Sequence, residues 1–213
     1  MRDCIIVTSI VEITDKPFSF TSVRSVYTHQ ERFEQTLETI ESIRKHLPDT
    51  DIILAECSPD SEYMKELEKR VDIFINTYPN DNIRHGSHKG LCEAQLMLYV
   101  FDRIDLSQYQ NIFKMTGRYK LTDRFDRSRW MTNSALACRS LLYGGDGNMH
   151  TFFYKFTNKE LNIITNILET MISNDTTDPI EHVMYNRLKP NLDNISEIGI
   201  EVIWSCYNST YHA

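Results

Sequence analysis

The chain has 213 residues and a formal net charge of −7, with 41% hydrophobic and 25% charged residues. This acidic balance, without a run of basic residues, argues against a partner that is nucleic acid or a charged membrane surface, although it leaves room for a local basic pocket. No apolar stretch approaches the roughly 20 residues of a membrane span. The length suits one domain over residues 1–213, either alone or as part of a longer protein.

The N-terminal half alternates strand-like and helix-like segments. The apolar, β-branched run at residues 4–11 predicts a strand buried on both faces, and the long polar loop 14–29 follows it. Apolar residues three and four apart predict a helix over 30–47. The next predicted elements are strands at 51–55 and 71–75, with a helix between them that starts at 58–60 and ends at 70.

These crossovers predict where a ligand binds. Short strand–helix–strand units produce parallel neighbours whose carboxyl ends meet at one edge of the sheet. Ligands of such sheets bind beyond that edge. We therefore expect four polar side chains near these strand ends to gather there: Thr8, Ser9, Glu56 and Asn76.

The second half continues the pattern. The polar loop 78–90 and a helix over 91–104 lead to a strand at 109–115. Further predicted elements are strands at 141–143, 151–156 and 200–207, the last closing the sheet, and helices at 158–173 and 179–188. The predicted fold class is α/β, with a central, mostly parallel sheet of about six strands flanked by helices.

The cysteines and the N-terminus indicate a reducing compartment. The five cysteines are scattered, odd in number and never spaced C-x-x-C, which is typical of reduced core thiols. The first residues run directly into a strand-like segment, without the pattern of a signal peptide. We therefore expect a cytoplasmic protein.

Several common ligand motifs are absent from the sequence. It contains neither G-x-G-x-x-G nor G-x-x-x-x-G-K-[ST], and its seven glycines leave little room for either. This argues against dinucleotide oxidoreductases and P-loop enzymes. The G-x-S-x-G elbow and the H-E-x-x-H zinc motif are also missing.

The segment NIFKMTGRYKL, residues 111–121, offers a different way to bind a ligand. It begins as an apolar strand and ends in Thr116, Gly117 and Arg118. A glycine followed by a cation at a strand end is well suited to hold an anion. The same pattern is also compatible with an arginine that simply faces solvent.

Three segments together resemble nucleotide-sugar glycosyltransferases of the GT-A fold. They are ERFEQTLETIESIRKHLPDTDIILAECS at 31–58, HKGLCEAQ at 88–95 and FKMTGRYKL at 113–121. Within that fold the chain is similar to chlorella-virus glycosyltransferase domains that build capsid glycans, over about residues 1–190. The resemblance implies transfer of a sugar from a UDP-sugar to a glycan or glycoprotein acceptor, in the host cytoplasm if the protein is viral.

The resemblance also implies roles for individual residues. Thr8 and Ser9 would face the uridine, and Glu56 would accept hydrogen bonds from the base or ribose. Lys89 and Gly90 would lie beside the nucleotide at a helix start, where backbone N–H groups favour phosphate. Arg24, in the long loop, is a further candidate for phosphate binding.

The strand end at 116–118 departs from the family pattern. Thr116, Gly117 and Arg118 stand where these enzymes usually carry Asp-x-Asp, whose carboxylates hold a divalent metal. Either Arg118 replaces part of that charge, or Mn²⁺ or Mg²⁺ is held elsewhere, by Asp146 or His150. A literal D-x-D at residues 49–51 precedes the second strand, at the opposite edge of the sheet.

An inverting transfer needs a carboxylate base near the acceptor hydroxyl. Asp146, in a glycine-flanked turn, and Glu181, at a helix start, are the candidates. Both are equally compatible with structural roles, as a turn former and a helix-start carboxylate. A nucleotidyltransferase, or a module that binds a nucleotide or sugar without turnover, stays an alternative to a glycosyltransferase.

Overall fold

A computed structural model describes residues 2–139, 147–204, 206 and 210–213. These residues form a seven-stranded sheet in the order β3-β2-β1-β4-β7-β6-β8 and a three-stranded sheet in the order β10-β9-β5. The strands of the large sheet are β1 (Arg2–Thr8), β2 (Thr50–Glu56), β3 (Ile73–Asn76), β4 (Tyr109–Thr116), β6 (Ala135–Arg139), β7 (Met149–Phe156) and β8 (Leu192–Asn194).

The large sheet confirms the predicted α/β class. Strands β1 to β4 are mutually parallel, β7 runs against both β4 and β6, and β8 is parallel to β6. Only β7 is therefore reversed, and the sheet is mostly parallel. The carboxyl ends of β1, β2, β3 and β4 lie at one edge, as predicted.

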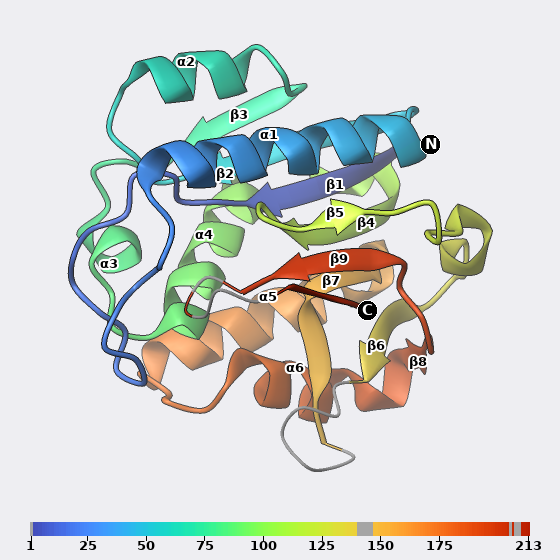
Figure 1. Ribbon diagram of the computed structural model, residues 1–213. Coiled ribbons are helices and arrows are strands. Elements are labelled where there is room, and N and C mark those ends of the chain that lie inside the picture. The colour runs from blue at the N-terminus through green and yellow to red at the C-terminus, as the bar shows by residue number, and fades with distance from the viewer. Residues whose placement is uncertain (1, 140–146, 205, 207–209) are drawn as a thin grey trace.

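The helices cover both faces of this sheet (Figure 1). They are α1 (His29–His46), α2 (Glu62–Glu68), α3 (Asp81–Arg84), α4 (Lys89–Arg103), α5 (Asn158–Ser173) and α6 (Ile180–Leu188), with 3₁₀ turns η1 (Leu106–Gln108), η2 (Arg127–Trp130) and η3 (Lys189–Asn191). Capping boxes start α1, at Thr28 and Glu31, and α5, at Thr157 and Glu160. In each, the side chains at the two ends of the first turn bind each other's backbone N–H groups.

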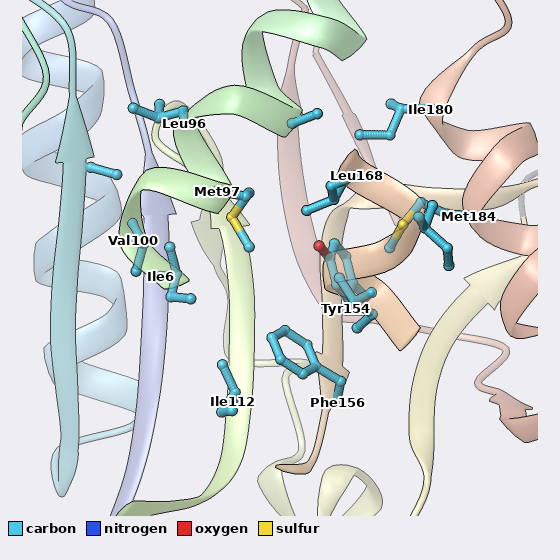
Figure 2. Packing of buried hydrophobic residues seen from close by; sticks show 14 of the residues in the cluster. Ile6, Leu96, Met97, Val100, Ile112, Tyr154, Phe156, Leu168, Ile180 and Met184 are labelled. Atoms are coloured by element: carbon cyan, nitrogen blue, oxygen red, sulfur yellow. The ribbon is translucent and has the colours of Figure 1, made fainter. Parts of the chain in front are cut away.

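Alternate residues of β1 pack into two separate cores, which explains its continuous apolar sequence. Cys4 and Ile6 belong to the core under α4, α5 and α6, whereas Ile5 and Val7 belong to the core under α1 and α2. Figure 2 shows Met97 and Val100 of α4, Ile6 of β1 and Ile112 of β4 in the first core. Burial on both faces fixes the register of β1, because a slip of one residue would exchange its two sets of side chains.

The C-terminal strand corrects one prediction. Residues 200–207 were expected to close the main sheet, but β9 (Ile200–Ile203) pairs with β5 (Lys120–Leu121) and β10 (Thr210–His212) in the second sheet. Its apolar residues Ile200 and Val202 pack into the core on the α1 side. The apolar pattern of this segment identified a buried strand but not the sheet to which it belongs.

Other expectations concern smaller features. Within the described part of the chain, no helix combines the length and apolar character that a membrane crossing requires. Cys4, Cys57 and Cys92 are free thiols. The predicted strand at 141–143 lies outside the described residues, as does the side chain of Cys138.

Candidate functional site

A pocket lies at the edge of the sheet where β1 and β4 end. The loop after β1, the helix α1 and the first turns of α4 complete its walls. Its volume is about 80 Å³, which suits a small charged group and is well below the roughly 300–1,000 Å³ of pockets that enclose a whole ligand. Four cations and one carboxylate line it: Arg24, Arg32, Lys89, Arg118 and Glu93.

Gly117 allows the ends of β1 and β4 to meet closely. A Cβ atom at this position would lie 2.9 Å from the Cβ of Ser9 and 3.3 Å from the carbonyl oxygen of Thr8. The Gly117 N–H donates to that same carbonyl (2.9 Å), and the Thr36 hydroxyl donates to the Gly117 carbonyl (2.9 Å). The glycine therefore fixes the backbone from which Arg118 enters the pocket.

Arg118 is buried, and the contact recorded for its guanidinium is with an aromatic ring, because Cζ lies 5.7 Å from the centre of the Tyr119 ring. The residue is only 6% exposed, yet its side chain makes no hydrogen bond or ion pair with any residue that the structure describes, and its buried Nε has no partner. The guanidinium has five N–H donors, and a buried donor left unsatisfied costs about 1–3 kcal/mol. An anion in the pocket would supply the missing acceptors.

Lys89 and the start of α4 add to this positive site. Lys89 is the first residue of α4 and lines the pocket; no described residue forms a hydrogen bond or ion pair with its amino group. Burial alone would lower the pKa of Lys89, but the nearby Tyr119, Glu93 and Glu181 outweigh it and raise the pKa. The His88 side chain does not cap the helix, and its first turn contains no acidic residue. The first turn of α4 therefore contains no side chain that compensates the positive end of the helix dipole.

Arg32 and Arg24 line the same pocket but are held by backbone carbonyls. Arg32 donates from Nε to the carbonyl of Ile10 (2.9 Å). Arg24 donates from Nη1 to the carbonyls of Lys16 (3.1 Å) and Gly86 (2.9 Å). Burial and the charge of Arg118 lower the pKa of Arg32 to about 9, and burial lowers the pKa of Arg24.

A buried lysine beneath the pocket behaves differently from Arg118. Lys114 is fully buried and forms an ion pair with Glu93, and it also donates to the Thr116 hydroxyl (3.0 Å) and the Thr151 carbonyl (2.9 Å). These three acceptors use all its N–H donors. The Thr151 hydroxyl in turn donates to Glu181 (3.2 Å), which places the Glu181 carboxylate next to this network.

Of the predicted site residues, the structure brings Thr8, Ser9, Arg24, Lys89, Thr116 and Arg118 together around the pocket. Glu56 and Asn76 lie at the predicted edge, at the ends of β2 and β3. Neither lines the pocket, and Gly90, the second residue of α4, packs against Ile180 instead.

The placement of Glu56 departs from the expected nucleotide contact. Glu56 is completely buried and accepts hydrogen bonds from the N–H groups of Val11 and Cys57 and from the Ser58 hydroxyl. Burial raises its pKa, although these hydrogen bonds oppose the shift. The carboxylate ties the loop after β1 to the end of β2, and Glu56 does not line the pocket.

The described residues do not fit the divalent metal that the resemblance implies. Among residues 2–139 and 147–204, no three His, Cys, Asp or Glu side chains are grouped as metal ligands. His150 lies on β7 with its ring 4.5 Å from that of Phe152, and burial lowers its pKa to about 4. Asp146 lies outside the described residues. The literal D-x-D at 49–51 is at the opposite edge, where Tyr109 donates to Asp51 (3.1 Å).

Sequence reasoning missed Arg32, Phe18 and Glu93 as pocket residues. Arg32 and Thr36 lie on the same face of α1 as Ile40 and Ile43, four and seven residues further on, and all four are buried. Arg32 and Thr36 continue the apolar stripe of the helix toward the strand ends. Polar residues in such positions are the sequence signal that could have identified Arg32 as a pocket residue. Nothing comparable in the sequence marks Phe18 or Glu93.

The comparisons with known proteins concern the fold. No family model matches the chain, and no curated protein matches it by sequence. Many solved structures do match, and their shared architecture is that of GT-A enzymes.

The chain has a GT-A-like fold. It is similar to the glycosyltransferase GlyE of Streptococcus pneumoniae TIGR4, with 11% identity, a TM-score of 0.57, and coverage of 91% of this chain and 45% of GlyE. A glycosyltransferase involved in glycosylation of the major capsid of PBCV-1 matches at 8% identity and a TM-score of 0.52, over 91% of this chain and 81% of that one. The expected similarity to viral capsid glycosyltransferases is therefore confirmed at the level of the fold.

Two further solved structures have a similar fold. The galactosyltransferase LgtC matches at 13% identity and a TM-score of 0.52, over 90% of this chain and 72% of that one. A nucleoside-diphosphate-sugar pyrophosphorylase from Vibrio cholerae RC9 matches at 12% identity and a TM-score of 0.51, over 94% and 95% of the two chains. This chain spans less than half the length of GlyE.

Proposed function

We propose that this chain is a glycosyltransferase that binds a UDP-sugar at the pocket between β1, β4 and α4 and transfers the sugar to a hydroxyl group of a glycan or glycoprotein. The observation that carries the proposal is the buried guanidinium of Arg118, which has no hydrogen-bond acceptor among the described residues and lies next to Lys89 at the carboxyl edge of a GT-A-like sheet. A diphosphate is the kind of ligand that satisfies both cations at once.

The size of the pocket supports binding of the diphosphate part of the donor there. A volume of about 80 Å³ accommodates phosphate but not a whole nucleotide sugar. The nucleoside would lie along Thr8, Ser9 and Phe18, where the loop after β1 closes the pocket. Binding would therefore move that loop outward, or leave the nucleoside in contact with its outer surface.

The reaction follows from this placement. The bond between the anomeric carbon and the diphosphate oxygen breaks, and its electron pair remains on the diphosphate. The acceptor oxygen forms the new bond to that carbon and gives its proton to a base. Positive groups fixed beside the leaving oxygen stabilise the charge that develops there.

Glu181 and Asp146 are the proposed candidates for the base if the configuration is inverted. Glu181 is partly exposed, accepts a hydrogen bond from Thr151 and lies within electrostatic range of Lys89 and Lys114. Its position beside the cationic pocket makes it the candidate that the described residues support. Asp146 stays a candidate on the sequence alone.

Binding and turnover measurements test the proposal. Calorimetric titration with UDP, UDP-glucose and UDP-galactose, with and without Mn²⁺, should detect binding, and a labelled UDP-sugar should be consumed when an acceptor is present. Failure to bind any of these ligands in either condition would refute the proposal.

A nucleotidyltransferase is the second candidate, favoured by the match to the pyrophosphorylase over nearly the whole of both chains. The products distinguish the two functions. A pyrophosphorylase would form a UDP-sugar and pyrophosphate from UTP and a sugar 1-phosphate, whereas a glycosyltransferase would release UDP. A protein that binds UDP-sugars but performs neither reaction would be a binding module.

A further inference from the structure

The chemistry of the strand end after β4 is opposite to what a divalent cation requires. Hard cations are held by carboxylate and carbonyl oxygens. Here the three residues that follow the body of the strand, Thr116, Gly117 and Arg118, provide no carboxylate and a buried positive charge. A divalent cation at this position would be repelled by Arg118 unless another anion stood between them.

The nearest carboxylates of the described site are already engaged. Glu93 is paired with the fully buried Lys114. Glu56 is completely buried and accepts hydrogen bonds from two backbone N–H groups and one hydroxyl. Freeing Glu93 for a metal would leave Lys114 as an uncompensated buried charge, at a cost of several kcal/mol. The carboxylates of Glu93 and Glu56 are therefore committed to holding the fold.

We propose that Arg118 and Lys89 replace the divalent metal, so that the nucleoside diphosphate binds, and leaves after sugar transfer, on protein cations alone. The inference rests on the proposed function and concerns the same pocket. Arg118 presents a planar set of donors that matches two phosphate oxygens, and Lys89 provides a second positive charge at the N-terminus of α4.

The other two arginines of the pocket contribute positive charge but are not proposed to bind the diphosphate directly. Arg24 and Arg32 are fixed by backbone carbonyls and add positive charge to the walls. With Glu93 neutralised by Lys114, the lining carries an excess of positive charge in a protein whose net charge is −7. The electrostatic field of the pocket thus favours binding of an anion that carries no metal ion.

The deciding experiment is titration of the unmodified chain with UDP, first in EDTA and then in Mn²⁺. We expect comparable affinities in the two conditions. A gain of about tenfold or more on adding Mn²⁺ would overturn the inference while leaving the glycosyltransferase proposal intact. No binding of UDP or UDP-sugars in either condition would overturn the proposed function itself.

Variants assign the binding to the two cations. In EDTA, Arg118→Ala and Lys89→Ala should each weaken UDP binding by about 10- to 100-fold, the range expected for a charge-assisted hydrogen bond. Arg118→Lys, which retains the charge without the planar donors, should recover part of the loss and also serves if Arg118→Ala does not fold. Arg124→Ala is the matched control, because Arg124 is an exposed arginine six residues further along the chain; its affinity should be unchanged. Equal affinities in all four variants would remove Arg118 and Lys89 from the site.

Discussion

Gly117→Ala tests whether the close contact between the ends of β1 and β4, which positions Arg118, leaves room for a side chain. The new methyl group would lie 2.9 Å from the Cβ of Ser9 and 3.3 Å from both the Ser9 hydroxyl and the Thr8 carbonyl. The backbone cannot move away freely, because the Gly117 N–H and carbonyl are both hydrogen bonded. Overpacking of this kind costs about 1–3 kcal/mol, which urea unfolding would measure.

Substitutions at Ser9 separate the steric effect from other causes. Ser9→Gly removes the Cβ atom that causes the clash. Ser9→Ala removes only the hydroxyl and keeps that Cβ atom. In double-mutant cycles, Ser9→Gly should restore about 1 kcal/mol or more to Gly117→Ala, and Ser9→Ala should restore much less. Gly117→Ala with unchanged stability, or equal rescue by both Ser9 variants, would refute the reasoning.

Three further changes test other parts of the structure. Glu181→Gln should lower sugar transfer by about 10²- to 10⁴-fold with UDP affinity unchanged; unaltered transfer rates would exclude Glu181 as the base. Burial lowers the pKa of His150 to about 4, so its contribution to stability is full above pH 6.5 and is lost as the pH falls toward 4. Over this pH range, the free energy of unfolding of His150→Gln should therefore fall less than that of the unmodified chain, by up to about 3 kcal/mol. Arg24→Ala should increase hydrogen exchange in residues 16–24 and 86–88, because it removes the hydrogen bonds to Lys16 and Gly86; unchanged exchange would show that other contacts hold the loop.

Elements with strong periodicity were predictable from the sequence. The helix predicted over 158–173 is α5 (Asn158–Ser173), and the strand predicted over 109–115 ends one residue later, at Thr116. Both segments carry enough apolar residues at regular spacing to indicate their type and their buried face. The parallel arrangement of β1 to β4 followed from their crossovers.

Short elements gave no comparable signal. β5 has two residues and β8 has three, one half-buried and two exposed. Their strand conformation depends on partners from distant parts of the chain, because two or three residues contain no measurable period. The second sheet, built from β5, β9 and β10, could not be predicted for this reason, and β9 was assigned to the wrong sheet.

The position of the candidate pocket was predictable, but its lining was predictable only in part. Strand ends locate Thr8, Ser9 and Arg118, because topology alone brings them to one edge. Glu56 instead accepts a hydrogen bond from the N–H group of Val11, forty-five residues earlier, and does not line the pocket. Such a contact is set by the path of the loop after β1, and no local pattern encodes that path.

Lys114 and Arg118 show why charge in a sequence does not by itself define a binding site. They stand four residues apart in NIFKMTGRYKL, are both almost completely buried, and are chemically similar cations. Lys114 has a carboxylate, a hydroxyl and a carbonyl as acceptors, so its positive charge is satisfied by protein groups. Arg118 has no acceptor among the described residues, and burying it in that state is unfavourable unless an anion binds. A structural cation therefore differs from a ligand-binding one in whether the fold supplies acceptors for it. The three-dimensional arrangement of Glu93, Thr151 and their neighbours determines this, and the sequence alone does not show it.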